Sequence, residues 1–149
     1  MLEKYFTDFH RDMTTFGGAY FYLILTLIFL VFHQYKIFYT LLFGFISTYV
    51  TGFIIRLFYF KERPAKEKYS NLITKIDASS FPSIHTARVM FIVLVLSRFF
   101  SNNLLTVIFI FIALLTAYSR IYIKKHYFID VAAGFLIGVV IHLVSVRLI

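Results

Sequence analysis

Long apolar runs are the feature that most restricts how this chain can fold. Over the whole chain 60% of residues are hydrophobic and only 15% are charged, which is more apolar surface than a soluble domain of 149 residues can cover. Runs that approach 20 residues with few charges are typical of helices that cross a bilayer. We therefore predict a single all-α membrane domain over residues 1–149, a polytopic helical bundle with about five transmembrane helices. The predicted spans are residues 18–34, 37–60, 85–100, 103–120 and 127–147.

The third and fourth spans are short and are joined by the polar turn Ser101-Asn102-Asn103. Helices of roughly 16 residues reach only about 24 Å. This is less than the hydrocarbon core of a bilayer, which is about 30 Å thick. We expect the ends of these helices to lie below the membrane surface.

Two further stretches have the pattern of amphipathic helices that lie on a membrane face. In residues 2–13 the apolar side chains recur at helical spacing, and they are Leu2, Tyr5, Phe6, Phe9 and Met13. In the linker 61–84 the corresponding side chains are Tyr69, Leu72, Ile73 and Ile76. For the linker, a polar loop is the alternative interpretation.

The order of the spans places most charged residues at one end of the bundle. The second span ends at the linker, and the third and fourth then cross the membrane and return. The linker and the junction 119–127 should therefore share one face with the N-terminal segment. All seven acidic residues fall there, whereas the opposite face has only Lys36, Arg98 and Arg147 nearby.

Charge and composition exclude several classes of function. The chain has no cysteine, which rules out disulfides and thiolate chemistry. We see no basic stretch followed by a short apolar core and a cleavage site, and so expect no removable signal peptide. The net charge of +8 comes without a compact basic domain, so we expect lipid headgroups or phosphate substrates as partners rather than nucleic acid.

Three clusters of polar residues meet at the charged end. They are RLFYFKERP at residues 56–64, FPSIHTAR at 81–88 and SRIYIKKHYFID at 119–130. Arginine offers a planar fork of donors that suits phosphate oxygens. The free N–H groups of residues 83–85, at the start of the third span, would also point at an anion. The clusters therefore predict an anion cage.

Two histidines in these clusters suit phosphoryl chemistry. His126 and Asp130 are four residues apart and would be neighbours on one face if the helix begins that early. A carboxylate on one imidazole nitrogen fixes the tautomer and leaves the other nitrogen free to attack. His85 can then act as general acid for the leaving oxygen. A site with two histidines and one carboxylate could alternatively bind a metal, but the surrounding arginines would oppose a cation.

Together the three clusters resemble the motifs of the type 2 phosphatidic acid phosphatase family, which also includes the vanadium haloperoxidases. The family patterns are K-x6-R-P, P-S-G-H and S-R-x5-H-x3-D. Residues 56–64 match the first pattern with Arg56 in place of lysine. Residues 82–85 match the second with Ile84 in place of glycine, and residues 119–130 match the third at every specified position.

The resemblance implies a role for each matched residue. His126 would be the nucleophile that forms a phosphohistidine, Asp130 would orient it, and His85 would protonate the leaving group. It also implies metal-independent catalysis without a cofactor. The groups that would hold the phosphoryl oxygens are Arg56, Arg63, Ser83, Arg120 and the backbone N–H of Ile84.

We therefore predict a membrane lipid phosphatase that hydrolyses a phosphomonoester or a pyrophosphate of a lipid. Candidate substrates are phosphatidic acid, phosphatidylglycerol phosphate and polyprenyl diphosphate. The alternatives are a lipid phosphotransferase using the same site and a non-catalytic protein that binds lipid phosphates. We expect a multi-pass protein of the cell membrane. The family resemblance favours an exterior catalytic face, whereas the lysine and arginine count favours a cytoplasmic one. The oligomeric state is left open.

Overall fold

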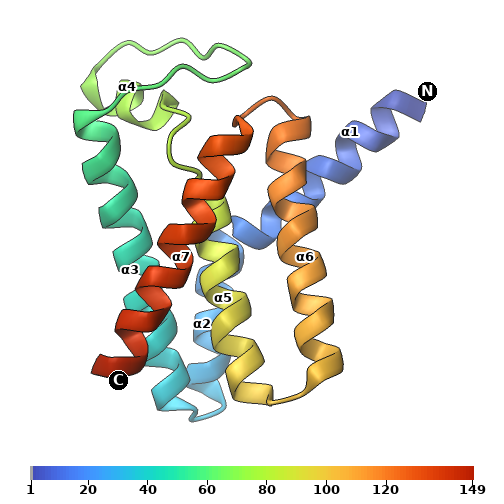
Figure 1. The fold of residues 1–149 in the computed structure, drawn as a ribbon, viewed down its shortest axis with the longest axis vertical. Coiled ribbons are helices and arrows are strands. Elements are labelled where there is room, and N and C mark those ends of the chain that lie inside the picture. Colours follow the sequence, from blue (N-terminus) through green and yellow to red (C-terminus); the bar gives the residue numbers. More distant parts are fainter. Residues whose placement is uncertain (1) are drawn as a thin grey trace.

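The computed structural model describes residues 2–149, and every regular element in that range is helical. The elements in chain order are α1 (Leu2–Met13), the short 3₁₀ helix η1 (Thr14–Gly17), α2 (Ala19–Val31), α3 (Tyr35–Phe58), α4 (Leu72–Ala78), α5 (Ile84–Phe100), α6 (Asn103–Tyr122) and α7 (Phe128–Leu148). Figure 1 shows α2, α3, α5, α6 and α7 packed into one bundle, with α1 projecting from it. The predicted all-α membrane bundle is confirmed.

Five helices lie close to the five predicted spans, but they differ in length. Three of them, α3, α6 and α7, are long and apolar enough to cross a membrane. A fourth span results if the segment from α1 through α2, which bends by 46° before Ala19, is counted as one. The helix α5 has 17 residues and is short, as expected, whereas α6 extends to Tyr122 and has 20.

The helix α5 lies at the centre of the bundle, between α7 and α6 in Figure 1. It packs against α3, α6 and α7, and its side chains Phe91 and Val89 are almost completely buried. Two glycines of α7 allow a close approach to α5. A Cβ added to Gly134 would lie 2.5 Å from the carbonyl oxygen of Ser83, and one added to Gly138 would lie 2.6 Å from that of Ala87. Small residues four apart are a common contact between membrane helices.

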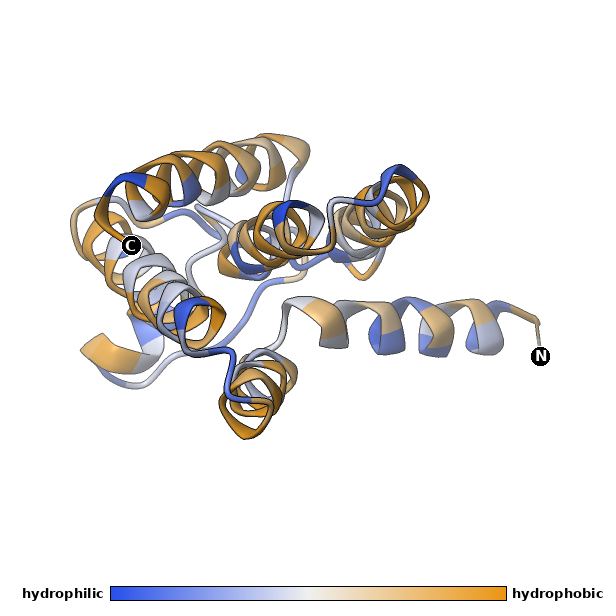
Figure 2. Cartoon of the chain, turned by 90° about the horizontal axis from the view of Figure 1, so that it is seen from below, coloured by the Kyte–Doolittle hydropathy of each residue, from blue (hydrophilic) through white to orange (hydrophobic). Residues whose placement is uncertain are grey.

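The predicted amphipathic helix over residues 2–13 is confirmed as α1. Figure 2 shows hydrophilic and hydrophobic residues alternating along this helix as it extends from the bundle. Its apolar side chains Leu2, Tyr5 and Phe6 are exposed. At the other end of α1, His10 is buried, and its Nδ1 lies 2.8 Å from Oγ of Ser119 on α6. This contact fixes α1 beside the third motif.

The linker differs from its prediction, because only Leu72–Ala78 is helical. This short helix, α4, begins at Asn71, whose side chain accepts a hydrogen bond from the Thr74 amide at 2.9 Å. The rest of the linker forms loops whose two arms pair with each other. The Ser80 amide donates to the Lys61 carbonyl at 2.8 Å, and the Ser80 hydroxyl donates to the Glu62 carbonyl at 3.1 Å. These loops position the linker residues of the site described below.

Candidate active site

The three motifs meet in a small cavity of about 110 Å³ at the charged end of the bundle. It lies where the linker, the start of α5 and the α6–α7 junction come together, and this confirms the arrangement expected from the order of the spans. Six of the eight predicted site residues line it. They are Arg56, Arg63, Ile84, His85, Arg120 and His126. The remaining lining residues are Tyr49, Asp77 and Arg88.

Four arginines line this cavity, and each keeps one buried donor free. Within residues 2–149, the Nε–H groups of Arg56, Arg63, Arg88 and Arg120 have no hydrogen-bond partner. Two of these guanidinium groups also donate to backbone carbonyls. Arg56 donates to the Pro82 carbonyl at 2.9 Å, and Arg63 donates to the Asp77 carbonyl at 2.7 Å. Buried donors without acceptors are costly, so the cavity is suited to an anion with several oxygens.

One carboxylate offsets part of this positive charge. Glu67 forms ion pairs with both Arg63 and Lys125. Partial burial of Glu67 would raise its pKa, but the hydrogen bonds from Lys125 and Arg63 outweigh burial and lower the pKa. Glu67 is therefore charged, and it fixes Arg63 at the edge of the cavity. Glu67 does not line the cavity itself.

His126 is held in the tautomer that a nucleophile requires. Its Nδ1 lies 2.6 Å from the Ser80 carbonyl oxygen. A carbonyl can only accept, so Nδ1 must carry the proton and Nε2 is left with its lone pair. Burial, followed by the positive charge of Arg120, lowers the pKa of His126 to about 2. The imidazole is therefore neutral, with Nε2 3.4 Å from Nη2 of Arg120.

Asp130 does not make the hydrogen bond to His126 that its position in the sequence suggests. The helix α7 begins only at Phe128, so the two residues do not share a helical face. The Asp130 Oδ2 lies 4.0 Å from Nδ1 of His126 and instead accepts from the Tyr127 amide at 2.8 Å. The other oxygen, Oδ1, lies 2.6 Å from Nζ of Lys61. Asp130 is fully buried and absent from the cavity lining.

The start of α5 brings two of its predicted site residues to the cavity. This helix begins at Ile84 and His85, and the first turn of a helix leaves its N–H groups without intrahelical acceptors. Ser83 differs, because it is fully buried and caps the helix. Its hydroxyl lies 2.9 Å from that of Thr86, and its amide donates to the Asp130 carbonyl at 3.0 Å. Ser83 is therefore not part of the cavity lining.

The comparison with known families agrees with this geometry. The sequence profile of the PAP2 superfamily matches residues 37–149, which include all three motifs. The chain belongs to the PAP2 superfamily. It is 31% identical over 97 residues to undecaprenyl-diphosphatase BcrC of Bacillus subtilis (strain 168). The match covers 64% of this chain, and the chain spans only 49% of the length of that relative.

A solved structure resembles this PAP2 chain over nearly its whole length. The crystal structure of Aquifex aeolicus LpxE superimposes with a TM-score of 0.79 and 26% sequence identity. The superposition covers 95% of this chain and 86% of LpxE. The α1–η1–α2 segment, which precedes the profile match, is thus largely included in the structural likeness.

This PAP2 chain departs from the family pattern at Ile84, and a glycine on α3 makes room for it. A Cβ added to Gly52 would lie 2.6 Å from Cγ1 of Ile84 and 2.7 Å from its Cδ1. The isoleucine side chain therefore lies directly against the backbone of α3, where any larger residue would collide with it. The isoleucine at position 84 of the second motif is thus accommodated by Gly52, which lies outside all three motifs.

We expect Gly52→Ala to destabilise the protein by about 1–3 kcal/mol, because the new methyl group overpacks against Ile84. In an Ile84→Ala background the same change should be neutral or stabilising, since alanine favours a helix over glycine by about 1 kcal/mol. Thermal unfolding in detergent of the four proteins of this double-mutant cycle measures the coupling. An equal effect of Gly52→Ala in both backgrounds would show that Ile84 does not fill this space.

Sequence reasoning missed three contributors to the PAP2 site. Arg88 belongs to the second cluster, but the family motifs give it no role, although its buried guanidinium lies 4.8 Å from the Phe45 ring centre and lines the cavity. The motifs also give no role to Lys61, although a buried Asp130 requires a cationic partner. The Ser80 carbonyl carries no signal in the sequence, since every residue has one. The alternative of a metal site gains no support, because no three His, Cys, Asp or Glu side chains group together in residues 2–149.

Proposed function

We propose that the protein is a membrane lipid phosphatase that cleaves a phosphomonoester or pyrophosphate from a lipid through a phosphohistidine at His126. One observation carries the proposal. The unprotonated Nε2 of His126 belongs to a cavity in which four arginines each leave a buried N–H without an acceptor. A phosphoryl group supplies the missing oxygens and the electrophilic phosphorus together.

The residues of the cavity divide the reaction between them. Nε2 of His126 attacks phosphorus, and the bond from phosphorus to the leaving oxygen breaks. His85 donates its proton to that oxygen, so it must enter the step as an imidazolium. It then takes a proton from the water that attacks the phosphohistidine and releases phosphate. Arg56, Arg63 and Arg120 neutralise the charge on the equatorial oxygens through both stages, and Arg88 adds a fourth guanidinium.

A second cavity supports a lipid as the substrate. It has a volume of about 240 Å³ and adjoins the first, because Tyr49, Arg56, Asp77 and Ile84 line both. Its other lining residues come from α3 and α4 and are mostly apolar. They are Phe53, Ile73, Thr74 and Ile76. A phosphate bound among the arginines would therefore have its apolar chain lying between α3 and α4.

One relative favours a diphosphate lipid among the candidate substrates. BcrC is described as an undecaprenyl-diphosphatase, and this chain aligns with about half of it. We therefore place polyprenyl diphosphate first, ahead of phosphatidic acid and phosphatidylglycerol phosphate. Phosphate release from these three lipids in one detergent, compared at equal mole fraction, tests the order.

We expect this phosphate release to persist in excess EDTA and to be inhibited by vanadate. The arginines already provide the positive charge that a divalent metal would supply, and vanadate can accept a bond from the histidine at the position of phosphorus. The measurement is phosphate release by the purified protein with EDTA, with added Mg²⁺ or Zn²⁺, and with vanadate. Activity that disappears in EDTA and returns with either metal would contradict the metal-independent mechanism.

A further inference from the structure

Two basic side chains, one lysine and one arginine, line the same cavity at the end of the bundle opposite the catalytic cavity. Lys36 lies in the first turn of α3 and Arg98 in the last turn of α5. All seven acidic residues of the chain are in α1, the linker, α4 or the start of α7, at the other end. Within residues 2–149 neither cation forms an ion pair. Both charges are therefore available to an anion that enters the cavity.

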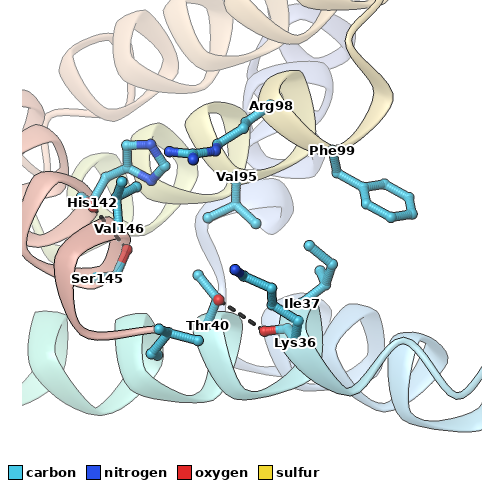
Figure 3. Close-up of a pocket in the computed structure, with 10 residues that line it drawn as sticks. Lys36, Ile37, Thr40, Val95, Arg98, Phe99, His142, Ser145 and Val146 are labelled. Carbon is cyan, nitrogen blue, oxygen red and sulfur yellow. Dashed lines mark hydrogen bonds between the residues drawn. The ribbon is translucent and has the colours of Figure 1, made fainter.

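This opposite cavity has a volume of about 290 Å³, close to the lower end of the range for small-molecule sites, about 300 Å³. The helices α3, α5 and α7 all contribute to its lining. Figure 3 shows the Arg98 guanidinium beside the ring of His142, and the Lys36 side chain extending toward the same space. Three nitrogen-bearing side chains from three helices thus converge on one volume.

His142 brings to this cavity a ring nitrogen that no group in residues 2–149 engages. Its Nδ1 is buried and has no hydrogen-bond partner in residues 2–149. The ring packs edge-on against the buried Phe91, with 5.9 Å between centroids, and this contact restrains its orientation. The nearby hydroxyls are already engaged, because Thr40 donates to the Lys36 carbonyl and Ser145 donates to the His142 carbonyl, each at 2.8 Å.

We propose that this cavity, formed by Lys36, Arg98 and His142, binds the phosphate headgroup of an anionic membrane lipid in the leaflet opposite the catalytic cavity. Phosphate oxygens accept from all three side chains at once. The cavity lies at the depth expected of lipid headgroups, since its lining residues are at the ends of the spanning helices α3 and α7. The apolar lining residues Ile37, Val95, Phe99, Val146 and Ile149 suit the glycerol and upper acyl chain. The proposal is independent of the proposed catalytic activity.

The chain contains no tryptophan, so a single introduced one reports locally on lipid contact. Phe99 lines the opposite cavity, and Phe99→Trp places the reporter there. We expect brominated phosphatidylglycerol to quench its fluorescence with a preference on the order of tenfold over brominated phosphatidylcholine, because two basic side chains attract the anionic headgroup. Leu104→Trp, exposed on the first turn of α6 at the same end, is the control outside the cavity and should show little preference.

The preference for phosphatidylglycerol should disappear in the double variant Lys36→Gln/Arg98→Gln. It should persist in Arg147→Gln, which removes a charge from the same end but lies outside the cavity lining. Circular dichroism of each variant establishes that it is folded. Equal quenching by both lipids, or equal loss of preference in Arg147→Gln, would overturn the proposal. A response to inorganic phosphate in phosphatidylcholine nanodiscs, lost in the double variant and without any lipid preference, would assign the cavity to a soluble anion and also overturn it.

Discussion

Replacing His126 with alanine is expected to reduce phosphate release by at least about 10³-fold, because loss of a nucleophile removes the covalent route altogether. The Nε2 of His126 is the atom that the Ser80 carbonyl leaves unprotonated, 3.4 Å from Arg120. The arginines remain in the variant, so vanadate or phosphate should still bind weakly. The direct measurement is the acid-labile phosphate trapped on the protein after a rapid quench, which should be present in the wild type and absent in His126→Ala.

His33→Ala is the matched control for this experiment. His33 is exposed at the opposite end of the bundle, where its Nδ1 lies 2.9 Å from the Tyr35 hydroxyl. It should keep both turnover and trapped phosphate. If His126→Ala still traps phosphate while His85→Ala does not, the roles of the two histidines are reversed.

Replacing His85 with alanine should have the second largest effect, and its size should depend on the leaving group. For a lipid alkyl phosphate we expect a loss of about 10²–10⁴-fold, the usual contribution of a general acid. For an aryl phosphate the loss should be much smaller, because a good leaving group departs without a proton. Trapped phosphate should still form from the aryl substrate, since His126 and the arginines are intact.

The comparison is the ratio of kcat values for wild type and His85→Ala on each substrate, each at saturation so that weak binding of the shorter aryl phosphate does not enter. An equal loss on both substrates would show that His85 acts by holding the phosphate or the helix start rather than by transferring a proton. The close packing of η1 against the start of α5 supports a role in holding the helix start, since a Cβ on Gly17 would lie 2.5 Å from the His85 carbonyl oxygen.

Hydrophobic patterning predicted the helices well wherever one face meets lipid or a packed core. The periodicity in residues 2–13 defined α1, and the long apolar runs defined α3, α6 and α7 to within a few residues. The same reasoning overextended the helix in the linker. Of the apolar side chains there, Tyr69, Leu72 and Ile73 are exposed and only Ile76 is buried, and the helix is limited to the seven residues that follow the Asn71 cap.

The arginines and histidines of the site were predictable because their chemistry depends on residue type. Their supporting contacts were not. The spacing of His126 and Asp130 indicated a direct bond, but His126 lies in the loop between α6, which ends at Tyr122, and α7, which begins at Phe128. Instead, the Ser80 carbonyl contacts His126, and Lys61 contacts Asp130. Both groups are positioned by hydrogen bonds between residues 61–62 and 79–80, and these contacts leave no periodic pattern in the sequence.

The central position of α5 has a consequence for how the chain enters the membrane during synthesis. This helix carries the buried Arg88, and it is not among the helices long and apolar enough to span alone. A charge in an unsheltered helix is costly in hydrocarbon. The two-residue turn Ser101–Asn102 ties α5 to the strongly apolar α6, so we expect the two to enter as a hairpin. Arg88 is then sheltered from lipid on its other side only once α7, which follows α6 in the chain, packs against α5.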